Sequence, residues 1–169
     1  LLWFLIVLSV LFAWLRDHML LKDEIAKLRG EILSLTKPNA NWGVEQLLGA
    51  PDTQGSGDIT TAWASATPDD QKEWIELDYL QAVDPQEIEI HETYNTGALY
   101  QVSVFDPVGR EVVVWSGTDP TPTGSGRGIS KISVKTLWKT KKVKIYLDSP
   151  AVPGWNEIDA VGLRDTQGN

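Results

Sequence analysis

The sequence predicts an all-β protein: an antiparallel β-sandwich of about eight strands, of the jelly-roll type, preceded by one N-terminal transmembrane and stalk α-helix. Three observations lead to this prediction. Short segments after residue 60 alternate apolar and polar side chains with a period of two, which is typical of strands with one buried face and one wet face. Turn signals recur between these segments, and no amphipathic helix interrupts them. The first 15 residues, in contrast, form one apolar run.

The apolar run LLWFLIVLSVLFAWL, residues 1–15, predicts a membrane anchor helix over residues 1–20. At about 1.5 Å per residue the run is roughly 22 Å long, and continuation through Met19 and Leu20 brings it closer to the roughly 30 Å hydrocarbon core of a bilayer. A signal peptide is the alternative interpretation. We favour a retained anchor, because no small-x-small cleavage motif follows the run and a charged helix does.

A juxtamembrane stalk helix is predicted over residues 21–35, because apolar residues recur there at spacings of four and three, the pattern of a coiled-coil seam. The seam is about two heptads long, which leaves self-association and contact with another helix as alternatives. A linker is predicted over residues 36–43, since Pro38 disfavours helical geometry at the residue before it. The residues expected to contact a partner helix are Leu21, Ile25, Leu28, Ile32 and Leu35.

The β-sandwich is predicted to span residues 44–165, with a helical turn near its start and a short tail over residues 166–169. A domain of about 130 residues buries roughly two-thirds of its surface on folding, so we expect it to be stable without disulfides or a structural metal ion. The expected strands cover residues 61–65, 73–79, 86–92, 100–106, 111–115, 128–134, 142–148 and 157–163. The side chains expected in the core are Ile75, Leu77, Ile88, Ile90, Val102, Val104, Val143, Ile145 and Leu147.

Composition excludes several classes of function. The chain has no cysteine, which excludes disulfides, thiol catalysis and thiolate metal sites. The formal net charge is −8, and acidic residues outnumber basic ones beyond residue 40, so we expect no binding to nucleic acid. The chain has two histidines, His18 and His91, and neither lies in a nucleophile–base pattern. A non-catalytic protein is therefore predicted.

Four segments, in this order, resemble the discoidin-like, galactose-binding-like jelly rolls of the coagulation factor 5/8 type C superfamily. They are LLGAPDT, AWASATPDDQKEWIELDY, EIEIHETYNTGALYQVSVFD and VKIYLDSPAVPGWNEIDAVGL, and the resemblance extends over roughly residues 44–165. The resemblance implies binding of glycans, lipids or proteins through loops at one end of the sandwich. It also implies an extracytoplasmic β-domain, periplasmic or at the cell surface. Basic residues after the anchor, such as Arg16 and Lys22, instead favour a cytoplasmic stalk.

A structural calcium ion is a second implication of the resemblance. Calcium takes six to eight oxygen ligands, and the loop GAPDTQGSGDITTAW offers Asp52, Asp58 and carbonyls freed by glycines. In the resembling family an acid near the last strand closes the site, and Glu157 occupies a comparable place. The three acids are therefore the candidate metal residues, although their spacing departs from the usual pattern of the family.

The segment PGWNEID, residues 153–159, allows two interpretations. In the first, Trp155, Asn156 and Glu157 bind a sugar together with Tyr94 and Asn95 from another loop. The indole stacks on the apolar face of the ring, and the amide and carboxylate groups bind the hydroxyls. In the second, the indole packs over the end of the sandwich and the polar side chains satisfy loop backbone groups. We favour the second interpretation, because a Pro-Gly turn directly before a buried strand leaves little room for a protruding platform.

Two further segments have structural explanations. Five lysines between residues 135 and 144 are expected to guard an edge strand against pairing, with contact to lipid headgroups or an acidic partner as the alternative. The glycine-rich segment GSGRG, residues 124–128, is expected to be a flexible hairpin loop, because it lacks the lysine and the following helix of a phosphate loop.

Together these features predict a non-catalytic, membrane-anchored interaction domain. Its partners would be the lipid bilayer and protein subunits of a larger membrane complex, for example a respiratory, photosynthetic or transport complex, on which it docks as an accessory or structural subunit. The alternative is an extracytoplasmic module that binds a glycan or a surface. Fold by itself does not decide between them.

Overall fold

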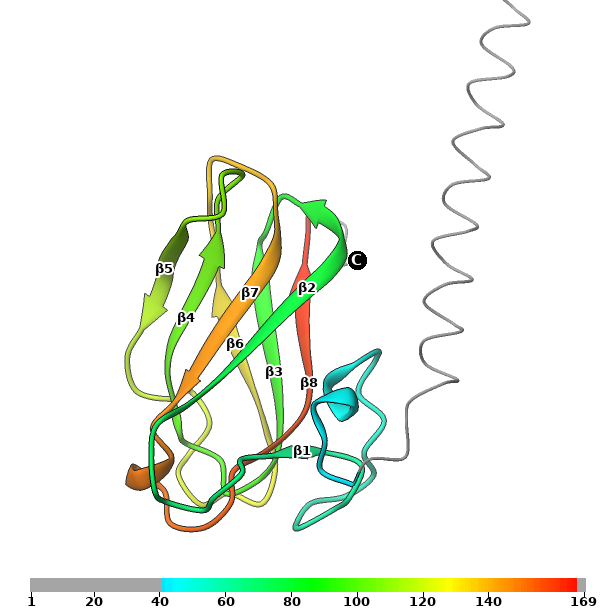
Figure 1. Ribbon diagram of the computed structural model, residues 1–169, viewed down its shortest axis with the longest axis vertical. Coiled ribbons are helices and arrows are strands. Elements are labelled where there is room, and N and C mark those ends of the chain that lie inside the picture. The colour runs from blue at the N-terminus through cyan, green and yellow to red at the C-terminus, as the bar shows by residue number, and fades with distance from the viewer. Residues whose placement is uncertain (1–40, 167–169) are drawn as a thin grey trace, which may run out of the picture. The chain divides into compact units, whose positions relative to one another are not determined.

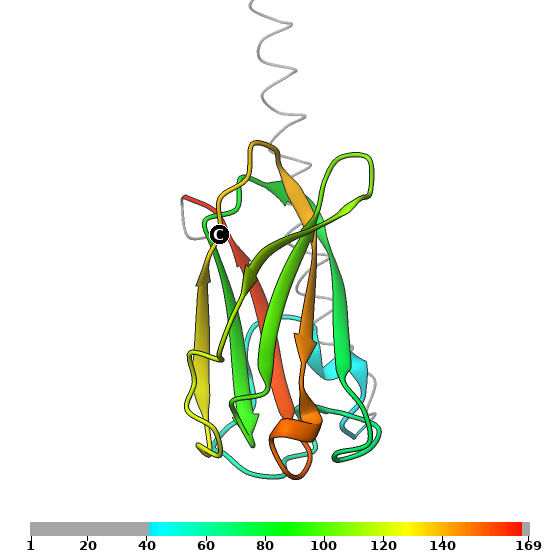
Figure 2. The ribbon, with the colours of Figure 1, turned by 90° about the vertical axis from the view of Figure 1, so that its left-hand side faces the viewer.

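The computed structural model describes residues 41–166, and these residues form two four-stranded sheets packed face to face (Figure 1, Figure 2). The elements are the 3-10 turns η1 (Val44–Leu47) and η2 (Ser149–Ala151) and the strands β1 (Trp63–Ala64), β2 (Glu73–Val83), β3 (Glu87–Tyr94), β4 (Leu99–Phe105), β5 (Glu111–Ser116), β6 (Gly128–Ser133), β7 (Thr140–Leu147) and β8 (Glu157–Arg164). The prediction of an eight-stranded sandwich is confirmed.

All strand pairs are antiparallel, with the order β1-β8-β3-β6 in one sheet and β2-β7-β4-β5 in the other. Strands that are distant in sequence become neighbours, as β3 and β8 do, so the chain crosses repeatedly between the sheets. The turn between β4 and β5 is a hairpin, closed by a 2.9 Å hydrogen bond from the Gly109 amide to the Asp106 carbonyl. The predicted antiparallel topology is therefore present.

The core lies between the two sheets and follows from the period-two alternation. Eight of the nine predicted core side chains are at most 6% exposed, and Leu77 is half-buried against the core. Ile88 and Ile90 project inward from β3, and Val143 and Ile145 project inward from β7. Because every second side chain of these strands is apolar, both sheets bury one face and leave the other to polar residues.

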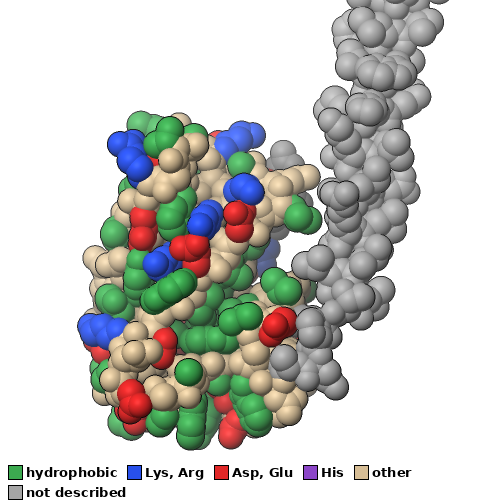
Figure 3. All heavy atoms as spheres, in the orientation of Figure 1, with side chains coloured by type: hydrophobic (Ala, Val, Ile, Leu, Met, Phe, Trp, Pro, Cys, Tyr) green, Lys and Arg blue, Asp and Glu red, His purple; other side chains and the backbone are tan. Residues whose placement is uncertain are grey.

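The lysine-rich segment is not an edge strand, contrary to the sequence-based expectation. It forms β7, which lies between β2 and β4 inside its sheet. Lys141 and Lys142 form ion pairs of 2.8 and 2.5 Å with Asp78 and Glu76 on β2, and Lys144 stacks 4.2 Å above the ring of Trp74. Acidic and basic side chains accordingly alternate on this face of the molecule (Figure 3). The lysines neutralise neighbouring acids instead of guarding an edge.

The glycine-rich segment GSGRG is not a hairpin loop either. It connects β5 to β6, which belong to different sheets. Gly124, at φ +73°, donates a 2.9 Å hydrogen bond to the Thr96 carbonyl, and Arg127 donates a 3.0 Å hydrogen bond to the Gly55 carbonyl. The segment thus crosses the end of the sandwich and links two other loops.

The domain begins earlier than predicted. Trp42 was assigned to the linker from sequence. Its amide donates a 3.1 Å hydrogen bond to the Thr60 carbonyl, and its carbonyl accepts a 3.2 Å hydrogen bond from the Ala64 amide. Within residues 41–166 no helix has the length and apolarity needed to cross a bilayer. The predicted anchor (1–20) and stalk (21–35), with the partner-helix residues Leu21, Ile25, Leu28, Ile32 and Leu35, lie outside the described residues.

Candidate functional site

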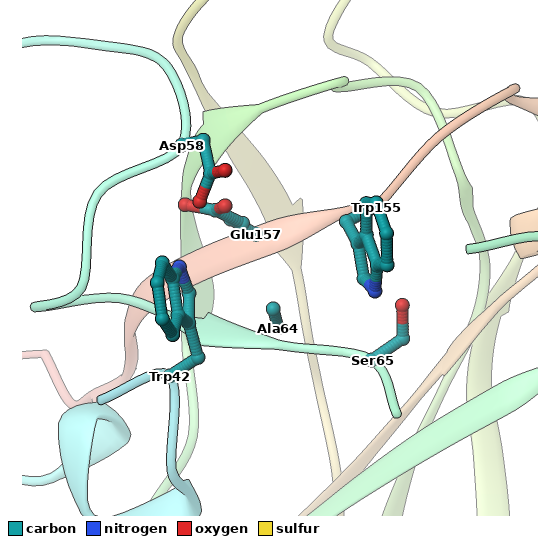
Figure 4. A pocket seen from close by; sticks show the side chains of 6 residues that line it. All are labelled: Trp42, Asp58, Ala64, Ser65, Trp155 and Glu157. Atoms are coloured by element: carbon teal, nitrogen blue, oxygen red, sulfur yellow. The ribbon is translucent and has the colours of Figure 1, made fainter. Parts of the chain in front are cut away.

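A pocket of about 350 Å³ opens beside the first residues of β8 (Figure 4). Four separate segments build it: the chain before η1, the loop before β1, β1 with the residue after it, and the η2–β8 loop with the first residue of β8. The residues that line it are Trp42, Asp58, Ala64, Ser65, Trp155 and Glu157. Figure 4 shows the two indoles on opposite sides, with Ala64 between them and the two carboxyl groups at one end.

Trp42 forms one wall of the pocket and has an uncommon backbone conformation. Its φ is +55°, in the left-handed region that bulky residues rarely adopt. The hydrogen bonds to Thr60 and from Ala64 fix this conformation, and the indole remains 37% exposed. Strained residues of this kind persist only where the surroundings determine them, and they cluster at functional sites.

Trp155 forms the opposite wall, and its loop is fixed by the β3–β4 loop. The Asn95 side chain donates a 3.0 Å hydrogen bond to the Trp155 carbonyl, and the Asn156 side chain donates a 2.7 Å bond to the Asn95 carbonyl. The Gly154 amide donates a 2.9 Å bond to Asp69. The backbone is thus held while the Trp155 indole stays 47% exposed.

The two interpretations of PGWNEID therefore each describe part of this segment. Asn156 is 3% exposed and, as the bracing interpretation expects, satisfies a loop backbone group. Trp155 does not pack over the end of the sandwich but projects at the pocket rim, contrary to that interpretation. Tyr94, half-buried at the end of β3 and paired in register with Glu157, does not line the pocket, and neither does Asn95.

Two buried oxygens of the pocket residues lack partners. Glu157 is 1% exposed, and its Oε2 accepts a 3.2 Å hydrogen bond from the Ile59 amide. Its Oε1 and the Oγ of the buried Ser65 have no hydrogen-bond partner among residues 41–166. An unpaired buried polar group costs about 1–3 kcal/mol, so a water molecule, an ion or a ligand that pairs with it stabilises the protein.

The pKa of Glu157 is raised to about 7, chiefly by burial and in addition by the charge of Asp58 and a side-chain interaction with it, whereas the Ile59 amide and the Trp42 side chain act to lower this pKa. The carboxyl groups of Asp58 and Glu157 point toward each other (Figure 4). A buried carboxyl beside a second carboxylate resists ionisation because both burial and like charge disfavour the anion. Perturbed acids in a pocket are typical of functional sites.

The predicted calcium residues are brought together only in part. Asp58 and Glu157 meet in the pocket, but Asp52 does not complete a group of three. The Asp52 and Thr53 amides lie 3.4 and 3.2 Å from Asp159 Oδ1 instead. In the described part of the chain no set of three histidine, cysteine or acidic side chains could hold a metal ion.

Other buried acids have their partners within the domain. Glu89 accepts 2.6 Å hydrogen bonds from Lys131 and Arg164, and the bond from Lys131 is the largest cause that lowers its pKa to about 2. Glu92 accepts hydrogen bonds from Ser130 and the Gly97 amide. Glu157 Oε1 and Asp159 Oδ2, in contrast, are buried carboxylate oxygens without a hydrogen-bond partner among residues 41–166, and of these two acids only Glu157 lines the pocket.

Comparison with known proteins decides the family. The family model of the pappalysin-1 SD scarf domain, C-terminal, matches residues 32–169. The chain belongs to this family. No curated protein matches its sequence.

Two solved structures share the fold of this scarf-family chain. The family 32 carbohydrate-binding module of Streptococcus pneumoniae EndoD is 9% identical, with a TM-score of 0.55, over 75% of this chain and 87% of the module. Chitosan-binding module 1 of a chitosanase/glucanase from Paenibacillus sp. IK-5 is 17% identical, with a TM-score of 0.51, over 72% and 84%. The resemblance to galactose-binding-like jelly rolls is therefore confirmed at the level of fold.

Sequence reasoning missed three residues of the pocket, Trp42, Ala64 and Ser65. Trp42 was assigned to a linker, and the other two were assigned to a strand without a role. The available signal was an aromatic side chain inside the polar stretch NANWG, because such a residue is buried by the domain or exposed for binding.

Proposed function

We propose that the described domain is a carbohydrate-binding module that holds a sugar between Trp42 and Trp155. One observation carries the proposal: two partly exposed indoles face one pocket. Two residues that line this pocket, Ser65 and Glu157, each carry a buried oxygen without a hydrogen-bond partner in the described part of the chain. The volume of about 350 Å³ falls within the roughly 300–1,000 Å³ typical of small-ligand sites.

The chemistry of these side chains matches a sugar. A pyranose ring has apolar faces of C–H groups and an edge of hydroxyls, so it needs an aromatic face and hydrogen-bond acceptors together. The indoles of Trp42 and Trp155 offer large, rigid apolar faces. The unpaired oxygen of Glu157 accepts a hydrogen bond from a sugar hydroxyl whether or not the carboxyl group is ionised.

The comparisons support the same class of function. The two solved structures compared above are named as a carbohydrate-binding module and a chitosan-binding module. They favour a glycan-binding module over the accessory subunit of a membrane complex that was the first prediction from sequence. Because a shared fold does not transfer function, the pocket and not the fold carries the proposal. Both neighbours are binding modules, so we also propose that this domain is itself non-catalytic.

The proposal includes an extracytoplasmic location. Glycans recognised by binding modules are displayed on surfaces and in extracellular polymers, and the predicted anchor over residues 1–20 would tether the domain near them. The same tether raises the local concentration of binding sites at a surface, which strengthens weak single-site binding.

A glycan array probed with the 169-residue chain tests the proposal. Because a membrane anchor is predicted over residues 1–20, the chain is kept in detergent. The detergent should have no sugar headgroup, so that it does not bind in the pocket. We expect a subset of glycans to be bound by the wild type and lost in Trp155→Ala. The matched control is Trp74→Ala, which removes another exposed tryptophan (56%) from the outer face of the other sheet. Absence of any bound glycan, or equal binding by Trp155→Ala, would overturn the proposal.

A further inference from the structure

Among the described residues no cation contributes to the pKa of Glu157, which distinguishes the acid pair of the pocket from Glu89. The groups that shift the pKa of Glu157 are burial, the Ile59 amide, Asp58 and Trp42, and none is a cation. Elsewhere Glu89 has Lys131 and Arg164. Two adjacent carboxyl groups lie at one end of the pocket (Figure 4), and a cation bound beside them would stabilise their ionised forms.

The walls of the pocket also suit a cation. An ammonium group near the face of an indole is attracted by the negative face of the ring, and the attraction grows when water is excluded. The domain already uses this contact on its outer surface, where Lys144 lies 4.2 Å above the ring of Trp74. In the pocket, Trp42 and Trp155 offer two such rings without a lysine between them.

We propose that the pocket selects a sugar that carries a free, protonated amino group, with the ring between the indoles and the ammonium group beside Asp58 and Glu157. This inference rests on the proposed function and names the class of glycan. An ammonium group donates three hydrogen bonds, and the unpaired Glu157 Oε1 is an acceptor for one of them. Ser65 lies at the other end of the pocket, beside Trp155 (Figure 4), where its Oγ is available to a sugar hydroxyl.

A metal ion fits the same site less well. Calcium takes six to eight oxygen ligands, whereas the pocket offers two carboxyl groups and one hydroxyl among apolar walls. An ammonium group needs fewer oxygens and gains from aromatic neighbours. The composition of the walls therefore favours the organic cation.

Discrimination against the acetylated sugar follows from charge. An N-acetyl group is neutral, so an acetylated ligand would shut two carboxyl groups away from water without a compensating charge. Leaving a charge unpaired when its surroundings lose water is costly, and sites use this cost to reject the wrong ligand. The free amine is therefore the form that the pocket prefers.

Isothermal titration calorimetry with the 169-residue chain tests this inference. The probes are the β-1,4-linked tetramers of glucosamine and of N-acetylglucosamine, titrated near neutral pH with a chelator present to exclude divalent ions. We expect the glucosamine tetramer to bind more tightly by roughly tenfold or more, and Asp58→Asn to reduce this preference to within about threefold. Asp58 is exposed, so its substitution should not unfold the domain. The matched control, Asp84→Asn, removes an exposed carboxylate at the end of β2 and should keep the preference.

The other possible results distinguish failure of the amino-sugar inference from failure of the proposed function. Equal affinity for the two tetramers, or a preference that Asp58→Asn leaves intact, overturns the amino-sugar inference while the carbohydrate-binding function stands. Tighter binding of the acetylated tetramer does the same. If neither tetramer binds and the glycan array is also empty, the proposed function itself fails. Glu157→Gln provides a second variant, in which the amide keeps an acceptor for the Ile59 amide but removes the negative charge.

Discussion

The side-chain amide of Asn95 lies 3.0 Å from the carbonyl oxygen of Trp155, 60 residues further along the chain, and donates a hydrogen bond to it. Asn156 returns a 2.7 Å hydrogen bond to the Asn95 carbonyl, so the two loops hold each other. Asn95 is at φ +44°, a conformation that asparagine adopts more readily than most residues. A fixed backbone with an exposed indole suits binding, because little conformational freedom remains to be lost.

Gly154→Ala should weaken this link. Gly154 has φ +97°, and a Cβ there would lie 2.6 Å from Asn95 Nδ2, so the amide must leave the Trp155 carbonyl. The left-handed conformation alone costs an alanine about 1–2 kcal/mol, and the lost hydrogen bond adds roughly 1 kcal/mol. Urea unfolding measures the sum of these two losses as a change in the free energy of unfolding.

The matched control is Gly109→Ala, at φ +83°, where a Cβ meets nothing within 4 Å. It carries the conformational cost without the clash. We therefore expect Gly154→Ala to be the more destabilising substitution and also to weaken glycan binding. Equal destabilisation with unchanged glycan binding would show that the Asn95–Trp155 link does not position the indole.

Two isoleucines on neighbouring strands test the core. Ile90 is fully buried on β3, whereas Ile129 on β6 is 47% exposed. Ile90→Ala should reduce the free energy of unfolding by about 2–5 kcal/mol, because it leaves a cavity. Ile129→Ala should reduce it by less than about 1 kcal/mol, the span of strand propensity. Similar losses for both variants, measured by urea unfolding, would contradict the assignment of the inner face.

The raised pKa of Glu157 predicts that the stability of the domain depends on pH. Burial raises the pKa of Glu157 from 4.5 to about 7, so between these values the folded protein binds more protons than the unfolded chain. The free energy of unfolding should therefore fall as the pH rises through this window. Glu92, whose pKa burial also raises to about 7, acts in the same direction. His91, whose pKa burial lowers, acts in the opposite direction below its ordinary value of 6.5.

Glu157→Gln isolates the contribution of one acid. The variant should lose less stability than the wild type between pH 4.5 and about 7, because the amide does not ionise and stays uncharged in the pocket. Urea unfolding at several pH values in this window gives the slope for each protein. If the two slopes agree, Glu157 does not carry the raised pKa.

The strands could be predicted from sequence because alternation is a local property. In EWIELDY and KVKIYLD each side chain points to the face that its position in the strand dictates, whatever the neighbouring strand is. Strand order is not local, and for this reason the lysines of β7 were assigned to an edge. Their partners, Glu76 and Asp78, lie more than 60 residues away on β2.

The pocket could be predicted only in pieces. Asp58, Trp155 and Glu157 were candidates, but for two different ligands, a metal ion and a sugar. The missing information was the position of Trp42, which depends on backbone hydrogen bonds to Thr60 and Ala64. Exposure of an indole likewise depends on which loops surround it, so the sequence did not show whether Trp155 braces or projects.

The central claim, that a sugar binds between Trp42 and Trp155, is tested most directly by the indole N–H signals of the ¹⁵N-labelled chain. The chain has eight tryptophans, and Trp42→Phe and Trp155→Phe assign the two signals of the pocket. Titration with the tetramers of glucosamine and of N-acetylglucosamine, and with lactose, should shift these two signals together and saturably for at least one probe, while the signal of Trp74 stays in place. Eight unchanged signals with all three probes, or shifts confined to tryptophans outside the pocket, would contradict the account.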